Sequence, residues 1–372
     1  MSCSDRRNNI GVANWAELQQ ELLTLIAKRV DFLEDFSAFR RVCRSWRSVA
    51  VKENFKGSEQ LPWLMLTQEG MEPRDYCPLF SATEGNLIGK LLLPEAQGKR
   101  CFETLGWFLT VSETRDMNLL HPLTRVQIPL PPISSSTEFC SIEKAVLSSC
   151  PCVSSKENNY VLMVIVRSRL KFWKPGEKAW TTIETPRSRI NDMAYCKGQF
   201  YAVGRRIFVC DTGGRDLTTV TAQVVGAIPS EIFDTKEPFI VESNGEVLIV
   251  FRDRYVGIED INIGGIGIVR PRGANRSRSF AVFKLDLSNG GLEELESLGD
   301  DALFLGRNAS ISVRASKCNG IRPNCIYYSK YFWGSLIVIG IYDMDKSQDL
   351  PRDVKTEPFS SIYSALWVTP YF

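Results

Sequence analysis

Imidazole, the side chain that most often transfers protons in catalysis, is scarce in this chain. His121 is the only histidine among 372 residues, and it stands directly before Pro122. A serine or cysteine nucleophile is usually activated by an imidazole base, so a catalytic arrangement of that kind would have to use His121. Because nothing in the surrounding sequence singles it out, we expect His121 to be a turn residue and not a base.

Paired carboxylates and glycine-rich segments offer no better start for an active site. Glycosidases place two carboxylates across the bond they cleave, whereas Asp300 with Asp301 and Asp343 with Asp345 are near neighbours in the chain. Neighbours within one strand or turn point apart or into solvent. The glycine-rich segment 263–269 lacks the Gly-Lys-Ser/Thr of a phosphate-binding loop, and no strand–glycine–helix unit surrounds it. We therefore predict no catalytic residue, no cofactor and no enzyme activity.

The eleven cysteines follow neither a disulfide pattern nor a metal-binding pattern. Their number is odd, they are scattered, and no Cys-x-x-Cys pair occurs. With one histidine available, a Cys/His zinc cluster has little to draw on. Cys196, Cys210 and Cys325 lie in apolar, strand-like runs. We therefore predict reduced, buried thiols in an intracellular protein, and no metal site.

Four arginines gather in the glycine-rich segment 262–279, namely Arg270, Arg272, Arg276 and Arg278. One interpretation of this segment is a solvated, mobile loop. The other is a patch that binds an acidic partner or a phosphate group, because guanidinium groups form bidentate pairs with both. The residues alone leave the two interpretations open, and the segment is the leading candidate for binding a partner protein.

Residues 15–55 predict three short amphipathic helices. The first spans residues 19–30, where apolar residues recur with the 3.6-residue period of a helix. The second follows Asp35 as its N-cap, and the third begins near Cys43. About forty residues are too few for an independent core. These helices should therefore be unable to bury their apolar residues among themselves, and part of their apolar face should lie on a partner.

The whole chain has the composition of a folded soluble protein, with 44% apolar and 24% charged residues. Its formal net charge of +2 creates no global field toward nucleic acid or acidic lipid, so we expect neither partner. The apolar runs at 161–166 and 336–341 are far shorter than the roughly 18 residues of a membrane span. The N-terminus has no apolar signal segment. We expect an intracellular protein, in the nucleus, the cytoplasm or both, built from a small module and one large domain.

Beyond residue 55 the pattern changes from helix to strand and turn. Hairpins are predicted around turns near residues 175, 205, 244 and 289, and the Asn-Gly pair at 244–245 is a strong type I′ signal. The spacing is unequal but brackets the period of about 40–50 residues of four-stranded propeller blades. A β-sandwich is the competing architecture, although about 310 residues are long for a sandwich. The tract at 361–372 could supply a strand that closes the propeller ring.

The N-terminal residues also carry a family resemblance. Trp15, Leu18, the pair Leu22-Leu23 and the run FRRVCRSWRS at 39–48 closely resemble an F-box. One departure is visible, because F-boxes usually have proline directly after the leucine at position 18, where this chain has glutamine. Proline there mainly presets φ at the helix start, so its loss should cost order and not recognition.

Residues 60–372 resemble the kelch-like domain that follows the F-box in a large family of plant F-box proteins. The segment HPLTRVQIPLPP at 121–132 and, most distinctively, ESLGDDALFLGRNASISV at 296–313 carry this resemblance. In the matching motif the position of His121 is commonly asparagine, which fits a turn role. The departures lie mainly in 253–279 and look like a loop insertion.

These resemblances imply the substrate-recognition subunit of an SCF-type ubiquitin ligase. The expected fold is an all-α F-box at 14–56 followed by an all-β domain at 61–372, most simply a kelch-like β-propeller. The F-box would dock on a Skp-type adaptor and through it on cullin, and the propeller would bind a protein target that the sequence does not name. The rival functions are a non-degradative binding or regulatory protein and a propeller enzyme tethered through its F-box. The apolar residues expected at the adaptor contact are Leu18, Leu22, Leu23, Ile26, Leu33, Phe39, Val42, Cys43 and Trp46.

Overall fold

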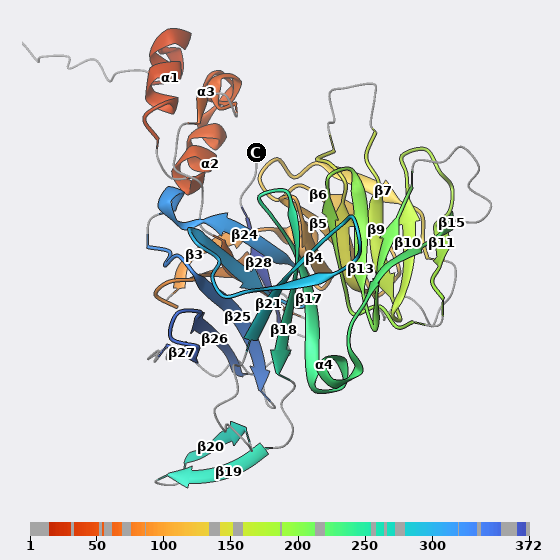
Figure 1. The fold of residues 1–372 in the computed structure, drawn as a ribbon. Helices are drawn as coiled ribbons and strands as arrows, with labels where there is room; N and C mark the ends of the chain where they lie inside the picture. The colour runs from red at the N-terminus through yellow and green to blue at the C-terminus, as the bar shows by residue number, and fades with distance from the viewer. Residues whose placement is uncertain are drawn as a thin grey trace, which may run out of the picture. The chain divides into compact units, whose positions relative to one another are not determined.

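The chain forms two compact units, Met1–Gln60 with Phe372 and Leu61–Tyr371 (Figure 1). The computed structural model describes residues 15–30, 33–51, 54–55, 62–68, 76–85, 87–133, 142–151, 159–186, 188–212, 220–253, 258–263, 266–271, 280–318, 320–332, 336–350 and 363–369. None of the helices in these ranges has the length and the apolar composition needed to span a membrane.

The first unit is helical. Its elements are the 3₁₀ turn η1 (Trp15–Glu17) and the helices α1 (Gln20–Ala27), α2 (Leu33–Val42) and α3 (Arg44–Val49). The predicted N-cap at Asp35 is wrong, because α2 already begins at Leu33. Cys43 separates α2 from α3, since its backbone is extended, with φ −160° and ψ −178°, and cannot continue the α-helical hydrogen bonds.

A small core joins the three helices. Leu23, Ala27, Phe36, Phe39 and Val49 are buried in one cluster, which also contains Ala50. The expectation that these helices cannot bury their apolar residues among themselves is therefore wrong for these positions. The core is nevertheless small for an independent domain, so the stability that it supplies should be modest.

The second unit is a six-bladed β-propeller in its described residues, which confirms the predicted fold class. Each blade is a twisted sheet of four or five strands, and the innermost strand of each blade comes first in the order that follows. Blade 1 consists of β28 (Tyr363–Val368), β1 (Trp63–Gln68), β2 (Tyr76–Ser81) and β3 (Leu87–Leu92); blade 2 of β4 (Arg100–Thr104), β5 (Trp107–Val111), β6 (Met117–Leu120) and β7 (Gln127–Leu130); and blade 3 of β8 (Ile142–Leu147), β9 (Leu162–Val166), β10 (Arg169–Trp173), β11 (Thr181–Glu184) and β15 (Val220–Thr221).

The other three blades include one with an unusual strand order. Blade 4 consists of β12 (Asp192–Cys196), β13 (Gln199–Val203), β14 (Arg206–Cys210) and β16 (Gln223–Ala227); blade 5 of β17 (Lys236–Ser243), β18 (Glu246–Asp253), β21 (Phe280–Leu285) and β22 (Leu292–Leu295); and blade 6 of β24 (Ser310–Arg314), β23 (Asp301–Leu305), β25 (Cys325–Phe332), β26 (Leu336–Asp343) and β27 (Gln348–Asp349). In blade 6 the strand β24 turns back to the inner side, so β23 pairs in parallel with β25. The short helical elements are η3 (Pro94–Ala96), α4 (Ser230–Thr235) and η5 (Ala315–Lys317).

The propeller ring is closed by the C-terminal strand, as the sequence predicts. The innermost strands contact one another in the order β28, β4, β8, β12, β17 and β24. β28 pairs with β1 along six residues, from Trp63 with Val368 to Gln68 with Tyr363. The buried Trp367 of β28 donates a hydrogen bond from Nε1 to the carbonyl oxygen of Leu305 in blade 6, at 3.0 Å. The last strand of the chain thus joins the first blade to the sixth.

Turn chemistry explains the register of the hairpins. Asn244 and Gly245 link β17 to β18 with φ values of 51° and 77°, which fits the predicted type I′ turn. The insertion of blade 5 contains the strands β19 (Ile258–Ile263) and β20 (Ile266–Pro271), which form an antiparallel hairpin that is a sheet of its own (Figure 1). The isoleucine and valine residues of these two strands favour that structure, because β-branched residues are enriched in strands.

The faces between blades form the core of the propeller. Clusters of apolar side chains join neighbouring blades, and several strands contribute continuous apolar runs such as Leu162–Val166, all buried. Trp107, Trp173 and Trp367 are buried in these clusters. Cys196, Cys210 and Cys325 are buried as well, and burial raises the pKa of the Cys210 thiol to about 12. Such a thiol stays protonated near neutral pH and is unreactive.

Candidate functional site

The helical unit leaves an apolar face uncovered. Helix α1 has two apolar sides: Leu23 is 1% exposed and lies in the core, whereas Leu22 and Leu25 are 46% and 55% exposed. Trp15 and Val42 are 61% and 56% exposed. Large apolar side chains that are half in water on so small a unit indicate a surface for a partner. We call Trp15, Leu22, Leu25 and Val42 the exposed apolar face.

The predicted adaptor-contact residues separate into two groups. Leu22 and Val42 belong to the exposed apolar face, and Leu18, Ile26, Cys43 and Trp46 are partly exposed. Leu23 and Phe39 are instead buried in the core of the unit, at 1% and 6% exposed. Their direct contact with a partner stays a prediction, but their position gives them a role in holding the helices together. The backbone of Leu33 begins α2, and its side chain lies outside the described residues.

Trp46 links α3 to the other helical elements of the unit. Its indole Nε1 donates a hydrogen bond to the carbonyl oxygen of Trp15 at 2.9 Å, and its ring lies 4.4 Å from that of Phe39 between centroids. These contacts attach the 3₁₀ turn η1 to α3 and so position Trp15 within the exposed apolar face. Substitution of Trp46 would therefore disturb both the core and the face.

Positive charge accompanies the apolar residues on α2 and α3. Arg40 donates from Nη1 to the carbonyl oxygen of Ala50 at 2.9 Å, and Arg47 donates from Nε to the carbonyl oxygen of Arg40 at 3.4 Å. Burial, and secondarily the positive charge of Arg47, lower the pKa of Arg40. The guanidinium groups thus satisfy carbonyl oxygens at the ends of these helices, which otherwise lack partners.

The face contains two residues that the predicted set omits. Leu25 lies three positions after Leu22 in α1, so the two share one side of the helix by the 3.6-residue period. That spacing could have identified Leu25. Trp15 is among the residues that carry the F-box resemblance, and its contact with Trp46 holds it on the unit.

The propeller candidates for catalysis have structural roles. His121 is 5% exposed and accepts hydrogen bonds at Nδ1 from the backbone N–H groups of Leu123 and Thr124, at 3.3 and 3.2 Å. Those contacts are what an asparagine makes in a tight turn, so the predicted turn role is confirmed. Asp301 accepts a hydrogen bond from the hydroxyl of Ser243, while Asp300 accepts from that of Ser316.

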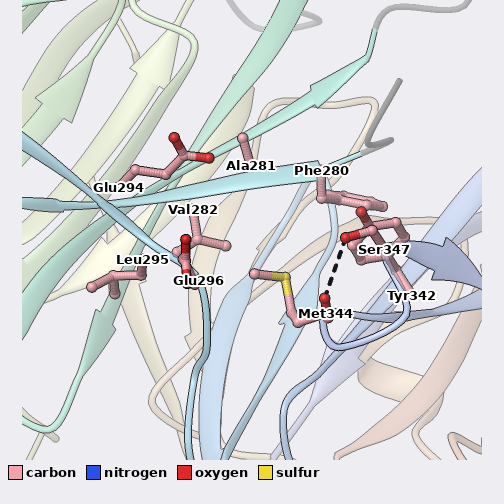
Figure 2. Close-up of a pocket in the computed structure, with 9 residues that line it drawn as sticks. All are labelled: Phe280, Ala281, Val282, Glu294, Leu295, Glu296, Tyr342, Met344 and Ser347. Atoms are coloured by element: carbon pink, nitrogen blue, oxygen red, sulfur yellow. Dashed lines mark hydrogen bonds between the residues drawn. The ribbon is translucent and has the colours of Figure 1, made fainter. Parts of the chain in front are cut away.

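The hollow of blades 5 and 6 is too small for a substrate. Figure 2 shows it between β21 and β22 on one side and the β26–β27 turn on the other, with Phe280, Glu294, Tyr342 and Met344 among its lining residues. Its interior has room for about one water molecule. In the ranges that the structure describes, no three His, Cys, Asp or Glu side chains cluster as metal ligands.

A polar network lies where the innermost strands meet. Lys144 of β8 forms a buried ion pair with Asp192 of β12 and donates from Nζ to the hydroxyl of Ser310 in β24, at 3.3 Å. Asp192 also accepts the backbone N–H of Ile240 in β17 at 2.9 Å. Burial raises the pKa of Asp192, and Lys144 opposes that effect. The network thus connects four blades across the centre of the ring.

The predicted arginine segment is only partly described. The backbone of Arg270 lies in β20, opposite Glu259 in β19. Arg272, Arg276 and Arg278 lie outside the described residues, so their role in binding a target stays a prediction.

Comparison with known protein families matches both units. The F-box domain model matches residues 15–57, and the KIB1-4 beta-propeller model matches residues 79–356. The second match covers most of the chain and most of the propeller. The chain belongs to the KIB1-4 beta-propeller family. Within this family it carries an F-box domain at its N-terminus, as the sequence resemblance implies.

Relatives from Arabidopsis thaliana align with this chain over most of their length. "F-box protein SKIP23" is 28% identical over 393 aligned residues, which cover 94% of this chain and 90% of the relative. "F-box/kelch-repeat protein KIB1" is 26% identical, with 88% and 81% of the two chains covered. "F-box protein At2g05970" is 24% identical over 97% of each chain. The chain is therefore similar to plant F-box proteins over both of its units.

Proposed function

We propose that this protein is a substrate-recognition subunit of an SCF-type ubiquitin ligase. The exposed apolar face of the F-box unit carries the proposal, because its large apolar side chains are left in water on a unit with a small core. Family membership supports the same role. In the complex a Skp-type adaptor covers the face and links the chain to cullin, and the propeller binds the target. The proposed units are 14–56 for the F-box and 61–372 for the propeller.

The exposed and the buried members of the predicted contact set have different roles in docking. Leu22 and Val42 enter the dry interface directly, together with Leu25 and Trp15, in a helix-in-groove mode. Leu18, Ile26, Cys43 and Trp46 form the partly exposed margin of that interface. Leu23 and Phe39 act from the core by fixing the angle between the helices.

The subunit itself performs no bond chemistry in this proposal. Its contribution is proximity, since a target held by the propeller lies near the ubiquitin-conjugating enzyme at a high effective concentration. The turn role of His121 and the separate contacts of Asp300 and Asp301 support a binding role for the propeller. The protein works inside the cell, in the nucleus, the cytoplasm or both.

Co-purification tests this function. The full chain, expressed in plant cells, should bring down a Skp-type adaptor and cullin together. The variant Leu22→Asp should lose both while its propeller stays folded, because the two units have separate cores. Recovery of the adaptor without cullin would instead support a non-degradative regulator. If the wild-type chain recovers neither the adaptor nor cullin, the proposal is refuted. A catalytic activity of the purified chain that persists in the variant without adaptor binding would indicate a tethered enzyme.

A further inference from the structure

Five exposed arginines come from three neighbouring segments of blades 3 and 4. Arg167 and Arg169 flank Ser168 at the turn from β9 to β10, Arg189 lies between β11 and β12, and Arg205 and Arg206 lie at the turn from β13 to β14. All five residues are exposed. We call these five residues the arginine strip.

Backbone contacts hold the three segments against one another. The N–H of Ile190 donates to the carbonyl oxygen of Ser168 at 3.0 Å, which joins the first segment to the second. The N–H of Asn191 donates to the carbonyl oxygen of Val203 at 2.7 Å, which joins the second to the third. A Cβ atom at Gly204 would lie 2.0 Å from the carbonyl oxygen of Arg189, so the close approach requires glycine there. The arginines therefore lie along one continuous edge of two packed blades.

The strip stands on rigid structure. Arg167 and Ser168 have φ values of 50° and 59°, as in a two-residue type I′ turn between paired strands. The strands behind both turns pack in one buried cluster, which contains Leu170 and Phe208. Side chains presented from tight turns on a packed scaffold are better fixed in space than those on a long loop.

Positive charge exceeds negative charge at this edge. Arg205 forms an ion pair with Asp234 at 2.5 Å. Glu143 accepts the backbone N–H of Ser168 at 3.0 Å, so this carboxylate is already engaged with the turn. Arg205 is thus paired and Arg167 has a contact of its own, so the surplus of positive charge comes from Arg169, Arg189 and Arg206. The surplus is local, because the whole chain has a formal net charge of only +2.

We propose that the arginine strip binds an extended acidic segment of the target protein, in which Asp and Glu carboxylates pair with the guanidinium groups. The inference rests on the proposed receptor function and names the class of segment that the propeller recognises. Arginine suits this role because its planar fork pairs with a carboxylate through two parallel hydrogen bonds. Several arginines along one edge match several carboxylates along one extended peptide. The near-zero net charge of the chain favours a local acidic peptide over the long field of a nucleic acid.

Peptide binding to the full chain tests the proposal. The probe is a fluorescein-labelled twelve-residue peptide of alternating Glu and Ser, and its matched control has Gln in place of Glu. The variant Arg167→Gln/Arg169→Gln/Arg189→Gln/Arg206→Gln removes four charges from the strip. The control variant Lys178→Gln/Arg307→Gln/Lys317→Gln/Arg322→Gln removes four charges from exposed positions elsewhere on the propeller.

The strip variant should bind the Glu peptide at least about tenfold more weakly than the wild type at low salt, since the small contributions of four exposed pairs are lost together. The control variant should stay within about twofold. Affinity should fall as salt rises, because exposed charges are screened. Equal binding by both variants, equal binding of the Gln peptide, or tighter binding of a twelve-base DNA strand would overturn the proposal.

Adaptor pull-down separates this inference from the receptor function. The strip variant should retain its thermal midpoint and should bring down the adaptor at wild-type yield, because its substitutions lie at the propeller edge. Failure of the wild-type chain to bind the adaptor would overturn the receptor function. The peptide assay would still show whether the arginine strip binds an acidic segment. If the strip variant loses the adaptor while the wild type and the control variant keep it, the assignment of the strip to target binding is overturned.

Discussion

Leu22 and Leu23 allow the docking face and the core of the F-box unit to be tested with one substitution at adjacent positions. The same change, Leu→Ala, removes the same atoms from both residues. Leu22 is 46% exposed, whereas Leu23 is 1% exposed and packs in the core cluster with Phe36 and Phe39. Any difference between the two variants therefore reports on environment and not on side-chain chemistry.

The expected magnitudes differ for folding and for docking. Leu23→Ala should cost about 2–5 kcal/mol of folding free energy, which is the range for a buried leucine. A core as small as this one rarely supplies more than about 3–5 kcal/mol, so Leu23→Ala should unfold most of the unit. Leu22→Ala should cost less than about 1 kcal/mol on folding, because nearly half of that side chain is already in water. At the adaptor interface it should cost about 2 kcal/mol, or roughly thirtyfold in affinity.

Hydrogen exchange and calorimetry on the full chain measure the two quantities. Leu23→Ala should lose the slow exchange of the α1 and α3 amides and, as a consequence, adaptor binding. Leu22→Ala should keep the slow exchange and lose only affinity. Leu87→Ala, at an apolar position of blade 1 that is 51% exposed, is the matched control and should change neither. Fast exchange in Leu22→Ala, or wild-type adaptor affinity in that variant, would refute the assignment of the two faces.

Three further predictions concern the propeller. Burial raises the pKa of Glu103 from an ordinary 4.5 to about 7, so the stability due to this group is present below pH about 4.5 and is lost as pH rises through 7. The free energy of unfolding of Glu103→Gln, measured in urea, should therefore rise relative to that of the wild type by up to about 3 kcal/mol between pH 5 and pH 8. A difference that does not change with pH would show that Glu103 does not titrate in this range. Lys144→Met should lower the free energy of unfolding by about 3–5 kcal/mol, because it leaves Asp192 buried without its partner, and Lys144→Met/Asp192→Leu should recover most of that loss in the same assay. No recovery would show that the cost does not come from the unpaired carboxylate. Trp367→Ala should cost about 3–5 kcal/mol, because a fully buried indole and its hydrogen bond to Leu305 are lost; a melting temperature within 2–4 °C of the wild type, about the shift for 1 kcal/mol, would contradict its role in ring closure.

Local patterns predicted the fold because the propeller is built from local pairs. The hairpin at Asn244-Gly245 follows from turn chemistry, and the apolar runs of the blades follow from burial on both faces. The inner position of β24 in blade 6 does not follow from such patterns. A strand that pairs with its predecessor on the inner side has the same local sequence signals as one that pairs on the outer side.

The candidate site was predicted less completely than the fold. The sequence predicts both Leu22 and Leu23 as adaptor contacts, yet adjacent residues on a helix point about 100° apart, and only the packing of α1 decides which is buried. The network of Lys144, Asp192 and Ser310 has no signal in the sequence. Its members are separated by 48 and 118 residues and meet only when the ring is closed.

The distance along the chain between β1 and β28 has a consequence for protein synthesis. The first strand of blade 1 begins at Trp63, and the strand that completes the same blade begins at Tyr363. At about 5–20 residues per second, a ribosome takes roughly 15–60 s to make the residues between them. During that interval the F-box unit has already emerged from the ribosome, while the propeller still lacks the strand β28. Under the proposed function, a chain that terminates early would therefore present the exposed apolar face without a completed propeller, and would compete with intact subunits for the adaptor.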